Sequence, residues 1–266
     1  MSTRNKPAPA ITLLTDFGSI DHYVGAIKGV MLGIAPAIPL IDITHDISAF
    51  DIAGAAYTLS QTWHCFPKGT VHLVIVDPGV GSARRPILAS IDGHYFVAPD
   101  NGVLGLVLEP AKSARVWEIT ASEYFRNHVS NTFHGRDIFA PVAAYLALGT
   151  SPDKFGQLID DTFQPRTVKP VRTSRRVWAG EITTVDRFGN LITNFPSAEF
   201  LLIDQKFTLQ VGFQMLDRLF SSYSDAQSEN PFVVHGSSGF LEVSVKEGDA
   251  SLAIGVRVGS PLELKQ

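Results

Sequence analysis

The sequence is poor in cysteine, in long apolar runs and in excess charge. Its 266 residues include one cysteine, Cys65, which excludes an internal disulfide and a zinc site made of cysteines. No stretch is long and apolar enough to cross a bilayer, and no apolar segment of a secretory signal follows the first residues. The formal net charge of -4 offers no attraction to nucleic acid or to an anionic membrane. We therefore expect a cytoplasmic protein with neither nucleic acid nor membrane as a partner.

Common motifs are missing as well. The sequence has no GxGxxG after its first predicted strand, no GxxxxGK[ST] phosphate loop and no GxSxG elbow of a serine hydrolase. It does have many residues suited to a core, with 45% hydrophobic and 18% charged side chains. This balance is typical of a globular protein.

In the first half of the chain, short apolar runs alternate with helical patterns. Strands are predicted at 11–14, 39–43, 71–76, 87–91, 95–97 and 116–119, and helices at 23–34, 52–63, 103–108 and 138–148. Asp21 and Asp51 are placed to cap the first two helices, and Asp92-Gly93 is a hairpin signal. The alternation predicts an α/β N-terminal domain, residues 1–155, with a mostly parallel central sheet.

The second half has a different pattern. Residues 156–175 show little periodicity and contain two prolines, which predicts a linker. Short β-branched runs follow at 178–185, 191–194, 207–211, 232–235, 240–245 and 252–256, separated by turn residues. They predict a smaller antiparallel, β-barrel-like C-terminal domain at 176–266.

The first half is organised around residues 71–85, VHLVIVDPGVGSARR, in which an apolar strand runs into a turn. Asp77 follows this strand, and Asp16 and Asp46 follow the two earlier ones. The carboxyl ends of parallel strands share one edge of a sheet, where α/β proteins bind ligands. Each aspartate alone could be a turn former or a helix cap. Three aspartates at one edge of the sheet favour a ligand-binding site.

Two further phrases carry candidate chemistry. His134 precedes a predicted helix and suits a general base or an orienting group. The alternative is a histidine bonded to a backbone carbonyl at the helix entrance. In DRFGN at 186–190, Asn190 offers the donor and acceptor that an adenine edge requires, and Phe188 offers a ring for stacking. The alternative there is a simple hairpin turn.

Six phrases, taken in order, resemble one protein family. They are LTDFG at 14–18, VDPGVG at 76–81, APDNG at 98–102, TFHGRD at 132–137, DRFGN at 186–190 and SSG at 237–239. The ordered set is similar to that of the S-adenosylmethionine hydroxide adenosyltransferases, which are relatives of the fluorinases and chlorinases. The resemblance covers nearly the whole chain, from residue 11 to about residue 259.

The resemblance implies a hydrolase. Water or hydroxide would attack the ribose 5′ carbon of S-adenosyl-L-methionine (SAM), and adenosine and L-methionine would be the products. It also implies an α/β N-terminal domain, a β-barrel-like C-terminal domain and a homotrimer. SAM would lie between the N-terminal domain of one subunit and the C-terminal domain of its neighbour. We expect no cofactor and no metal ion.

The family's functional residues fall on definite positions of this sequence. By motif, the water-activating triad is Asp77, Arg84 and His134, with Arg84 preferred to its neighbour Arg85. The implied substrate-binding residues are Asp16, Phe50, Asp186, Phe188, Asn190, Ser237, Glu242 and Val245. Asp16 would take the ribose hydroxyls, and Asn190 the adenine edge. Asp186 and Ser237 would hold the methionine ammonium and carboxylate.

Three other functions compete with the hydrolase. A halogenase would use chloride as its nucleophile, but the Asp77 carboxylate repels halide. A metallohydrolase would need Asp16, His22, Asp77 and His134 as ligands, a spacing that matches no compact metal motif. A non-catalytic sensor of SAM or adenosine would keep the pocket residues and lack turnover.

Overall fold

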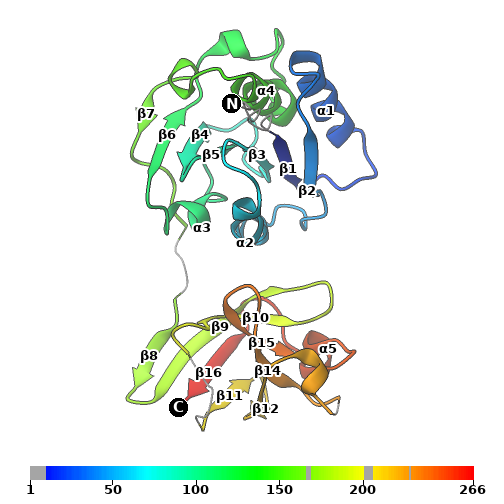
Figure 1. The fold of residues 1–266 in the computed structure, drawn as a ribbon, viewed down its shortest axis with the longest axis vertical. Coiled ribbons are helices and arrows are strands. Elements are labelled where there is room, and N and C mark those ends of the chain that lie inside the picture. The colour runs from blue at the N-terminus through cyan, green and yellow to red at the C-terminus, as the bar shows by residue number, and fades with distance from the viewer. Residues whose placement is uncertain (1–9, 166–168, 201–205, 228) are drawn as a thin grey trace, which may run out of the picture. The chain divides into compact units, whose positions relative to one another are not determined.

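The computed structural model describes residues 10–165, 169–200, 206–227 and 229–266. The chain divides into two compact units, Met1–Pro165 and Arg166–Gln266 (Figure 1). Among the described residues, no helix combines the length and the apolar character that crossing a membrane would require.

The N-terminal unit is built on a seven-stranded mixed sheet of order β2-β1-β3-β5-β4-β6-β7. Its strands are β1 Ile11–Thr15, β2 Leu40–Thr44, β3 Val71–Ile75, β4 Pro86–Ile91, β5 His94–Pro99, β6 Ala114–Glu118 and β7 Leu158–Ile159. Strands β2, β1, β3 and β5 run parallel, whereas the pairs β5–β4, β4–β6 and β6–β7 are antiparallel. The predicted mostly parallel sheet is therefore correct for one half of the sheet only.

A hairpin causes this difference. Asp92 and Gly93 have φ angles of 49° and 92°, the left-handed backbone of a two-residue hairpin turn. Strand β4 therefore pairs with its successor β5 without a crossover, and β6 adds to the free edge of β4. The sequence signal for the hairpin is confirmed.

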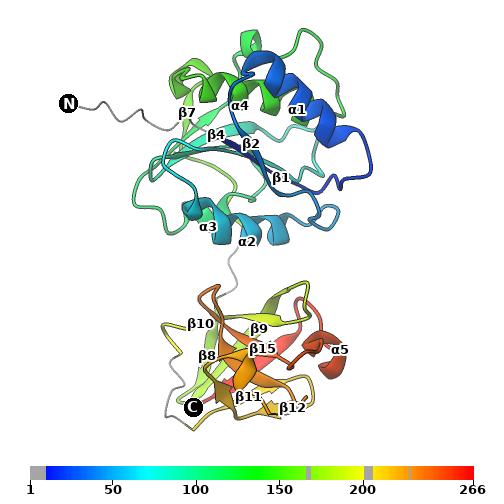
Figure 2. The ribbon, with the colours of Figure 1, turned by 45° about the vertical axis from the view of Figure 1, so that its right-hand side comes forward.

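Helices cover both faces of this sheet (Figures 1 and 2). Helices α1 Tyr23–Ile34 and α4 Ala140–Ala147 pack on one face, and α2 Ile52–Thr62 and α3 Gly105–Leu108 pack on the other. Val71, Leu73 and Ile75 of β3 join the core beneath α1 and α4, while Val74 joins the core beneath α2. Burial on both faces explains why this strand is apolar at every position except His72.

Of the predicted helix starts, one N-terminal cap is confirmed, one is wrong, and one helix begins earlier than predicted. Asp51 caps α2, because its Oδ1 accepts a hydrogen bond of 2.9 Å from the Gly54 amide. The predicted cap at Asp21 is wrong, since α1 begins after His22, whose side chain makes no capping hydrogen bond. The helix predicted at 138–148 begins earlier, with a π-helical turn, Gly135–Phe139, that leads into α4.

The C-terminal unit is built on a curled nine-stranded sheet (Figure 2). Its strands are β8 Val171–Ser174, β9 Val177–Val185, β10 Leu191–Pro196, β11 Thr208–Val211, β12 Gln214–Leu216, β13 Leu219–Phe220, β14 Phe232–His235, β15 Phe240–Ser244 and β16 Pro261–Lys265. The order is β12-β11-β16-β9-β10-β15-β14-β13, with β8 also paired to β9. All pairs are antiparallel except β13–β14.

Local patterns misled at two points. The run 252–256 was predicted as a strand, but its first three residues end helix α5 Ala250–Ile254 and the other two follow that helix. Asp249 caps this helix by accepting from the Leu252 amide at 2.9 Å, and Gly255 ends it with a φ of 76°. The segment 156–175, predicted as a linker, contains β7 and β8, each of which extends the sheet of its own unit.

Candidate active site

Asp77 lies in the loop that follows β3, at the carboxyl edge of the parallel strands. The loop turns back on itself through hydrogen bonds from the Val80 amide to the Asp77 carbonyl and from the Ser82 amide to the Gly79 carbonyl. Gly81 has a φ of 76°, and a Cβ there would collide with the carbonyl oxygen of Asn131. A glycine at this position therefore lets the loop pack against the segment that carries His134.

Arg84 joins Asp77 to His134. Its Nε donates to Asp77 Oδ1 at 2.9 Å, and its Nη2 donates to Asp77 Oδ2, which makes a bidentate ion pair. The same Nη2 donates to His134 Nδ1 at 2.9 Å. The arginine and aspartate side chains are only 8% and 6% exposed. The three predicted triad residues thus form one cluster, with the guanidinium in the middle, the aspartate and arginine side chains buried and His134 half-buried.

The guanidinium fixes the state of the His134 ring. Because an arginine N–H can only donate, Nδ1 must accept, and the proton of the neutral ring lies on Nε2. Burial, followed by the nearby charge of Arg84, lowers the pKa of His134 below its usual value, although Asp77 and Asp137 act in the opposite direction. His134 is therefore neutral near pH 7 and offers an N–H donor.

Backbone packing places His134 close to the sheet. A Cβ on Gly135 would lie 3.3 Å from Ile75 Cδ1, so the glycine lets the π-helical turn approach β3 closely. The next acid, Asp137, is fully buried and accepts from the Ser130 amide at 2.9 Å and from Arg136 Nε at 2.7 Å. These hydrogen bonds outweigh the cost of burial and hold the pKa of Asp137 below its usual value. Asp137 thus anchors the loop in front of His134.

Asp16 and Phe50 lie together on the same unit. Asp16 Oδ2 accepts from the Phe50 amide at 2.9 Å, in the loop between β2 and α2. Phe50 has a φ of 69°, which is a strained conformation for a bulky residue, and its side chain is 71% exposed. The third strand-end acid, Asp46, is exposed. Arg85 lies apart from the triad and pairs with Asp100 and Asp161.

The C-terminal unit carries an open cavity of about 860 Å³, within the range of small-molecule sites. It is lined by Asp186, Arg187, Phe188, Asn190, Tyr223, Ser237, Val245, Glu247, Gly248 and Asp249. Five of the predicted substrate-binding residues are among these, and Phe188 is 76% exposed.

Asp186 organises one wall of this cavity. Its Oδ1 accepts from the amides of Phe188 and Asn190, each at 2.9 Å, and its Oδ2 accepts from Asn190 Nδ2 at 2.8 Å. Gly189 has a φ of 82°, and a Cβ there would collide with the Asp249 carboxylate. The carboxylate of Asp186 is therefore engaged with its own turn, and it fixes the direction of the Asn190 amide.

Glu242 lies behind the cavity and does not line it. It is buried, and its Oε2 accepts from the Tyr223 hydroxyl at 2.9 Å while its Oε1 accepts from Ser238 Oγ at 3.2 Å. Tyr223 itself lines the cavity, and sequence analysis missed it. The one signal in the sequence near Tyr223 is a capping box, which Ser222 and Asp225 form around it.

In the described part of the chain, no group of three or more histidine, cysteine, aspartate or glutamate side chains is arranged to hold a metal ion. The α/β unit thus carries an acid–arginine–histidine cluster, and the β unit carries an open cavity. Residues 11–156 match the description "SAM hydroxide adenosyltransferase N-terminal domain", and residues 180–263 match "SAM hydroxide adenosyltransferase C-terminal domain". The chain belongs to this family.

Individual relatives are similar over nearly their whole lengths. The (R)-S-adenosyl-L-methionine hydrolases of Salinispora tropica and Thermus thermophilus are 36% and 34% identical to this chain; the matches cover 97% and 96% of this chain and 98% of each relative. A fluorinase from an Actinoplanes species is 26% identical, over 89% of this chain and 90% of its own length. A crystal structure of a conserved Thermotoga maritima protein superposes with a TM-score of 0.89 at 38% identity, covering 96% of this chain and 100% of that one.

Proposed function

We propose that this protein hydrolyses SAM to adenosine and L-methionine. The Asp77–Arg84–His134 cluster carries this proposal. It is supported by membership of the family and by the near full-length similarity to (R)-S-adenosyl-L-methionine hydrolases.

The reaction is a displacement at the ribose 5′ carbon. A water oxygen forms the new C–O bond while the C5′–S bond breaks, and its electron pair moves to sulfur. Methionine leaves as a neutral thioether, so the leaving group needs no proton. The water proton goes to the Asp77 carboxylate and from there to solvent. The cluster therefore has to align and deprotonate one water molecule.

Each member of the triad has a separate task. Arg84 orients the Asp77 carboxylate through two parallel hydrogen bonds and favours the negative charge that develops on the water. His134 donates its Nε2–H to the oxygen of the attacking water, because its Nδ1 is occupied by Arg84. This assignment makes Asp77 the base and His134 the orienting donor.

The two units divide the substrate between them. In the N-terminal unit, Asp16 takes the ribose hydroxyls and Phe50 packs against the ligand. In the C-terminal unit, Asn190 forms hydrogen bonds to the edge of the adenine, and Phe188 stacks on the face of its ring. Ser237 and Val245 complete the wall of the cavity. We propose a homotrimer in which the N-terminal unit of one subunit and the C-terminal unit of its neighbour enclose SAM. The exposure of Phe50 and Phe188 supports this arrangement.

Mixing two variants, each of which is nearly inactive at a SAM concentration far below its KM, tests the shared site. Asp77→Asn damages only the N-terminal unit, and Asn190→Ala damages only the C-terminal unit. If neighbouring subunits build the site, trimers reassembled from both variants contain some undamaged sites and regain activity. Mixtures that stay as inactive as the separate variants, while native mass spectrometry with an affinity tag on one variant proves that subunits have exchanged, would place the site within one chain.

The relatives' name also specifies the sulfonium configuration. We propose that this chain likewise consumes the (R)-epimer of SAM. A mixture of the two sulfonium epimers, followed by chromatography that resolves them, tests the preference. Loss of the (S)-epimer at an equal rate would contradict it.

Product analysis tests the function itself. Purified, chelator-treated protein is incubated with SAM in buffer that contains chloride, beside the Asp77→Asn variant. Adenosine and methionine from the wild type alone support the hydrolase. 5′-Chloro-5′-deoxyadenosine would instead identify a halogenase, and tight binding of SAM without turnover would identify a sensor. Activity that chelation abolishes and a divalent ion restores would identify a metallohydrolase.

A further inference from the structure

We infer that the turn Asp100–Asn101 is a positioning element for the catalytic pair, which it holds through the residues next to Asp77 and next to Arg84. The inference rests on the proposed function. This turn follows β5, and neither of its side chains has a role in the mechanism above.

The first connection runs from the turn to the end of β3. Asn101 Nδ2 donates to the Val76 carbonyl at 2.8 Å, and Asn101 Oδ1 accepts from the Val103 amide at 3.2 Å. Val76 is the residue immediately before Asp77. The side-chain amide therefore fixes the peptide from which the catalytic carboxylate projects.

The second connection runs from the turn to the other end of the catalytic loop. Asp100 Oδ2 accepts from Arg85 Nε at 3.0 Å and from Arg85 Nη2 at 2.7 Å, and the Asp100 amide donates to the Arg85 carbonyl at 2.9 Å. Arg85 is the residue immediately after Arg84. The Asp100 side chain is only 5% exposed, so this ion pair is shielded from solvent on the aspartate side.

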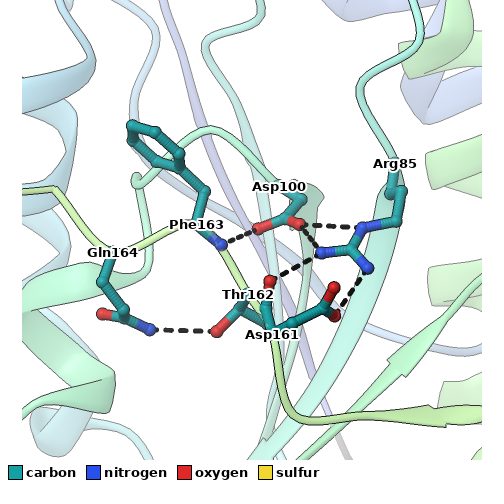
Figure 3. A network of polar contacts seen from close by, with 6 residues as sticks. All are labelled: Arg85, Asp100, Asp161, Thr162, Phe163 and Gln164. Atoms are coloured by element: carbon teal, nitrogen blue, oxygen red, sulfur yellow. Dashed lines mark hydrogen bonds and ion pairs between the residues drawn. The ribbon is translucent and has the colours of Figure 1, made fainter.

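The third connection reaches the segment that leads to the second unit (Figure 3). Asp100 Oδ1 accepts from the Phe163 amide at 2.8 Å, and Arg85 donates to the Asp161 carbonyl at 2.9 Å and to its carboxylate at 2.7 Å. A Cβ on Gly102 would lie 3.0 Å from the Pro165 side chain, so a glycine lets this segment pack closely on the turn.

The turn Asp100–Asn101 therefore forms hydrogen bonds to both ends of the loop that carries Asp77 and Arg84. The bidentate pair requires both side chains in register, and a shift of either flank would lengthen hydrogen bonds that now measure 2.9 Å at Arg84 Nε and at His134. Misplacement of reacting groups by about 1 Å costs up to about 100-fold in rate. The part-buried hydrogen bonds of Asp100 and Asn101 are suited to prevent such a shift.

The test compares part-buried and exposed members of the network. Asp100→Asn and Asn101→Ala each remove a part-buried interaction, whereas Asp161→Asn changes a carboxylate that is 72% exposed. For the two part-buried variants we expect kcat to fall about 10- to 100-fold with KM within about threefold of wild type. For Asp161→Asn we expect kcat within about twofold of wild type. Thermal unfolding is measured for all three, and kinetics are compared at a temperature where each is folded.

A second readout does not depend on turnover. NMR of the histidine ring nitrogens follows the titration of His134, whose pKa the Arg84 charge helps to lower. If the turn positions Arg84, the pKa of His134 rises toward its usual value in Asp100→Asn and stays unchanged in Asp161→Asn. An unchanged titration in folded Asp100→Asn and Asn101→Ala would overturn the inference, as would an unchanged kcat. A wild type that shows no hydrolysis would refute the proposed function and leave this NMR comparison decisive.

Discussion

In the N-terminal unit the Asp77–Arg84 pair is buried and hydrogen-bonded before any ligand arrives, whereas in the C-terminal unit Phe188 lies exposed at an open cavity. In this pair the negative charge of Asp77 is balanced by the positive charge of Arg84. In the second unit the Asp186 carboxylate is used on its own turn, and the cavity wall is left open for a ligand. Under the proposed function, substitutions at Asp77 should change the chemical step, and substitutions in the cavity of the second unit should change SAM binding.

The largest effect is expected from Asp77→Asn. The substitution keeps the shape of the side chain but removes the proton acceptor and the charge that Arg84 binds. We expect kcat to fall by about 10²–10⁴-fold, while KM stays within about threefold because the cavity lies in the other unit. Steady-state kinetics with SAM measure both constants. A rise in KM with kcat unchanged would move the chemical centre away from Asp77.

Phe188→Ala should act in the opposite way. Stacking of an aromatic ring on a base contributes about 1–3 kcal/mol, so we expect KM to rise about 5- to 150-fold with kcat nearly unchanged. Phe213→Ala is the matched control, because Phe213 is fully exposed and does not line the cavity. Equal effects of the two substitutions, or a loss confined to kcat, would break the separation between the two units.

A second histidine of the N-terminal unit sharpens the comparison, because it belongs to the core. His72 is fully buried, its Nδ1 lies 2.8 Å from Thr12 Oγ1, and its Nε2 lies 3.2 Å from His94 Nδ1. Burial, followed by the charge of His94, lowers the pKa of His72 to about 3. Protonation of this ring therefore opposes folding.

The sign of the pH effect follows from linkage. Below the unfolded-state pKa of about 6.5 the unfolded chain binds a proton that the folded core rejects, so stability is present above that pH and is lost as the pH falls toward 3. Between pH 6.5 and 5 the loss from His72 is about 2 kcal/mol. Urea unfolding at pH 7 and pH 5 measures it. Burial also lowers the pKa of His94 and of His134, so in His72→Gln the loss should shrink to the share of these two residues, and an equal loss in both proteins would refute the assignment.

The sequence predicted where the strands end better than it predicted how they pair and in which direction they run. Asp16 and Asp77 were placed by the rule that parallel strands end at one edge, and both follow parallel strands, β1 and β3. Of the antiparallel half, the sequence predicted only the hairpin of β4 and β5, because a hairpin signal does not say which of its two strands pairs with further strands. The run 252–256 was read as a strand because a short apolar run fits both structures, and here the cap at Asp249 selected the helix.

For the site, local phrases located the loops but not their internal hydrogen bonds. Nothing in the spacing of Asp77, Arg84 and His134 says that the arginine lies between the other two, because that order depends on the turn at Gly81. Strand β16 was not predicted, although Leu262 and Leu264 alternate with polar residues. So short a run is a weak signal by itself, and it forms a strand here because it pairs with β9 and β11. Tyr223 was missed because its only sequence signal is the capping box of a one-turn helix, which says nothing about a cavity.

The smallest effect is expected from Glu242→Gln. Glutamine keeps an acceptor for the Tyr223 hydroxyl but loses the charge that strengthens the 2.9 Å hydrogen bond, which costs about 1 kcal/mol and predicts a KM about fivefold higher. If Glu242 acts by orienting Tyr223, then Tyr223→Phe already removes that interaction. The double variant should then bind SAM no worse than Tyr223→Phe alone. Additive losses would instead show that Glu242 also acts through Ser238, to which its other oxygen is bonded.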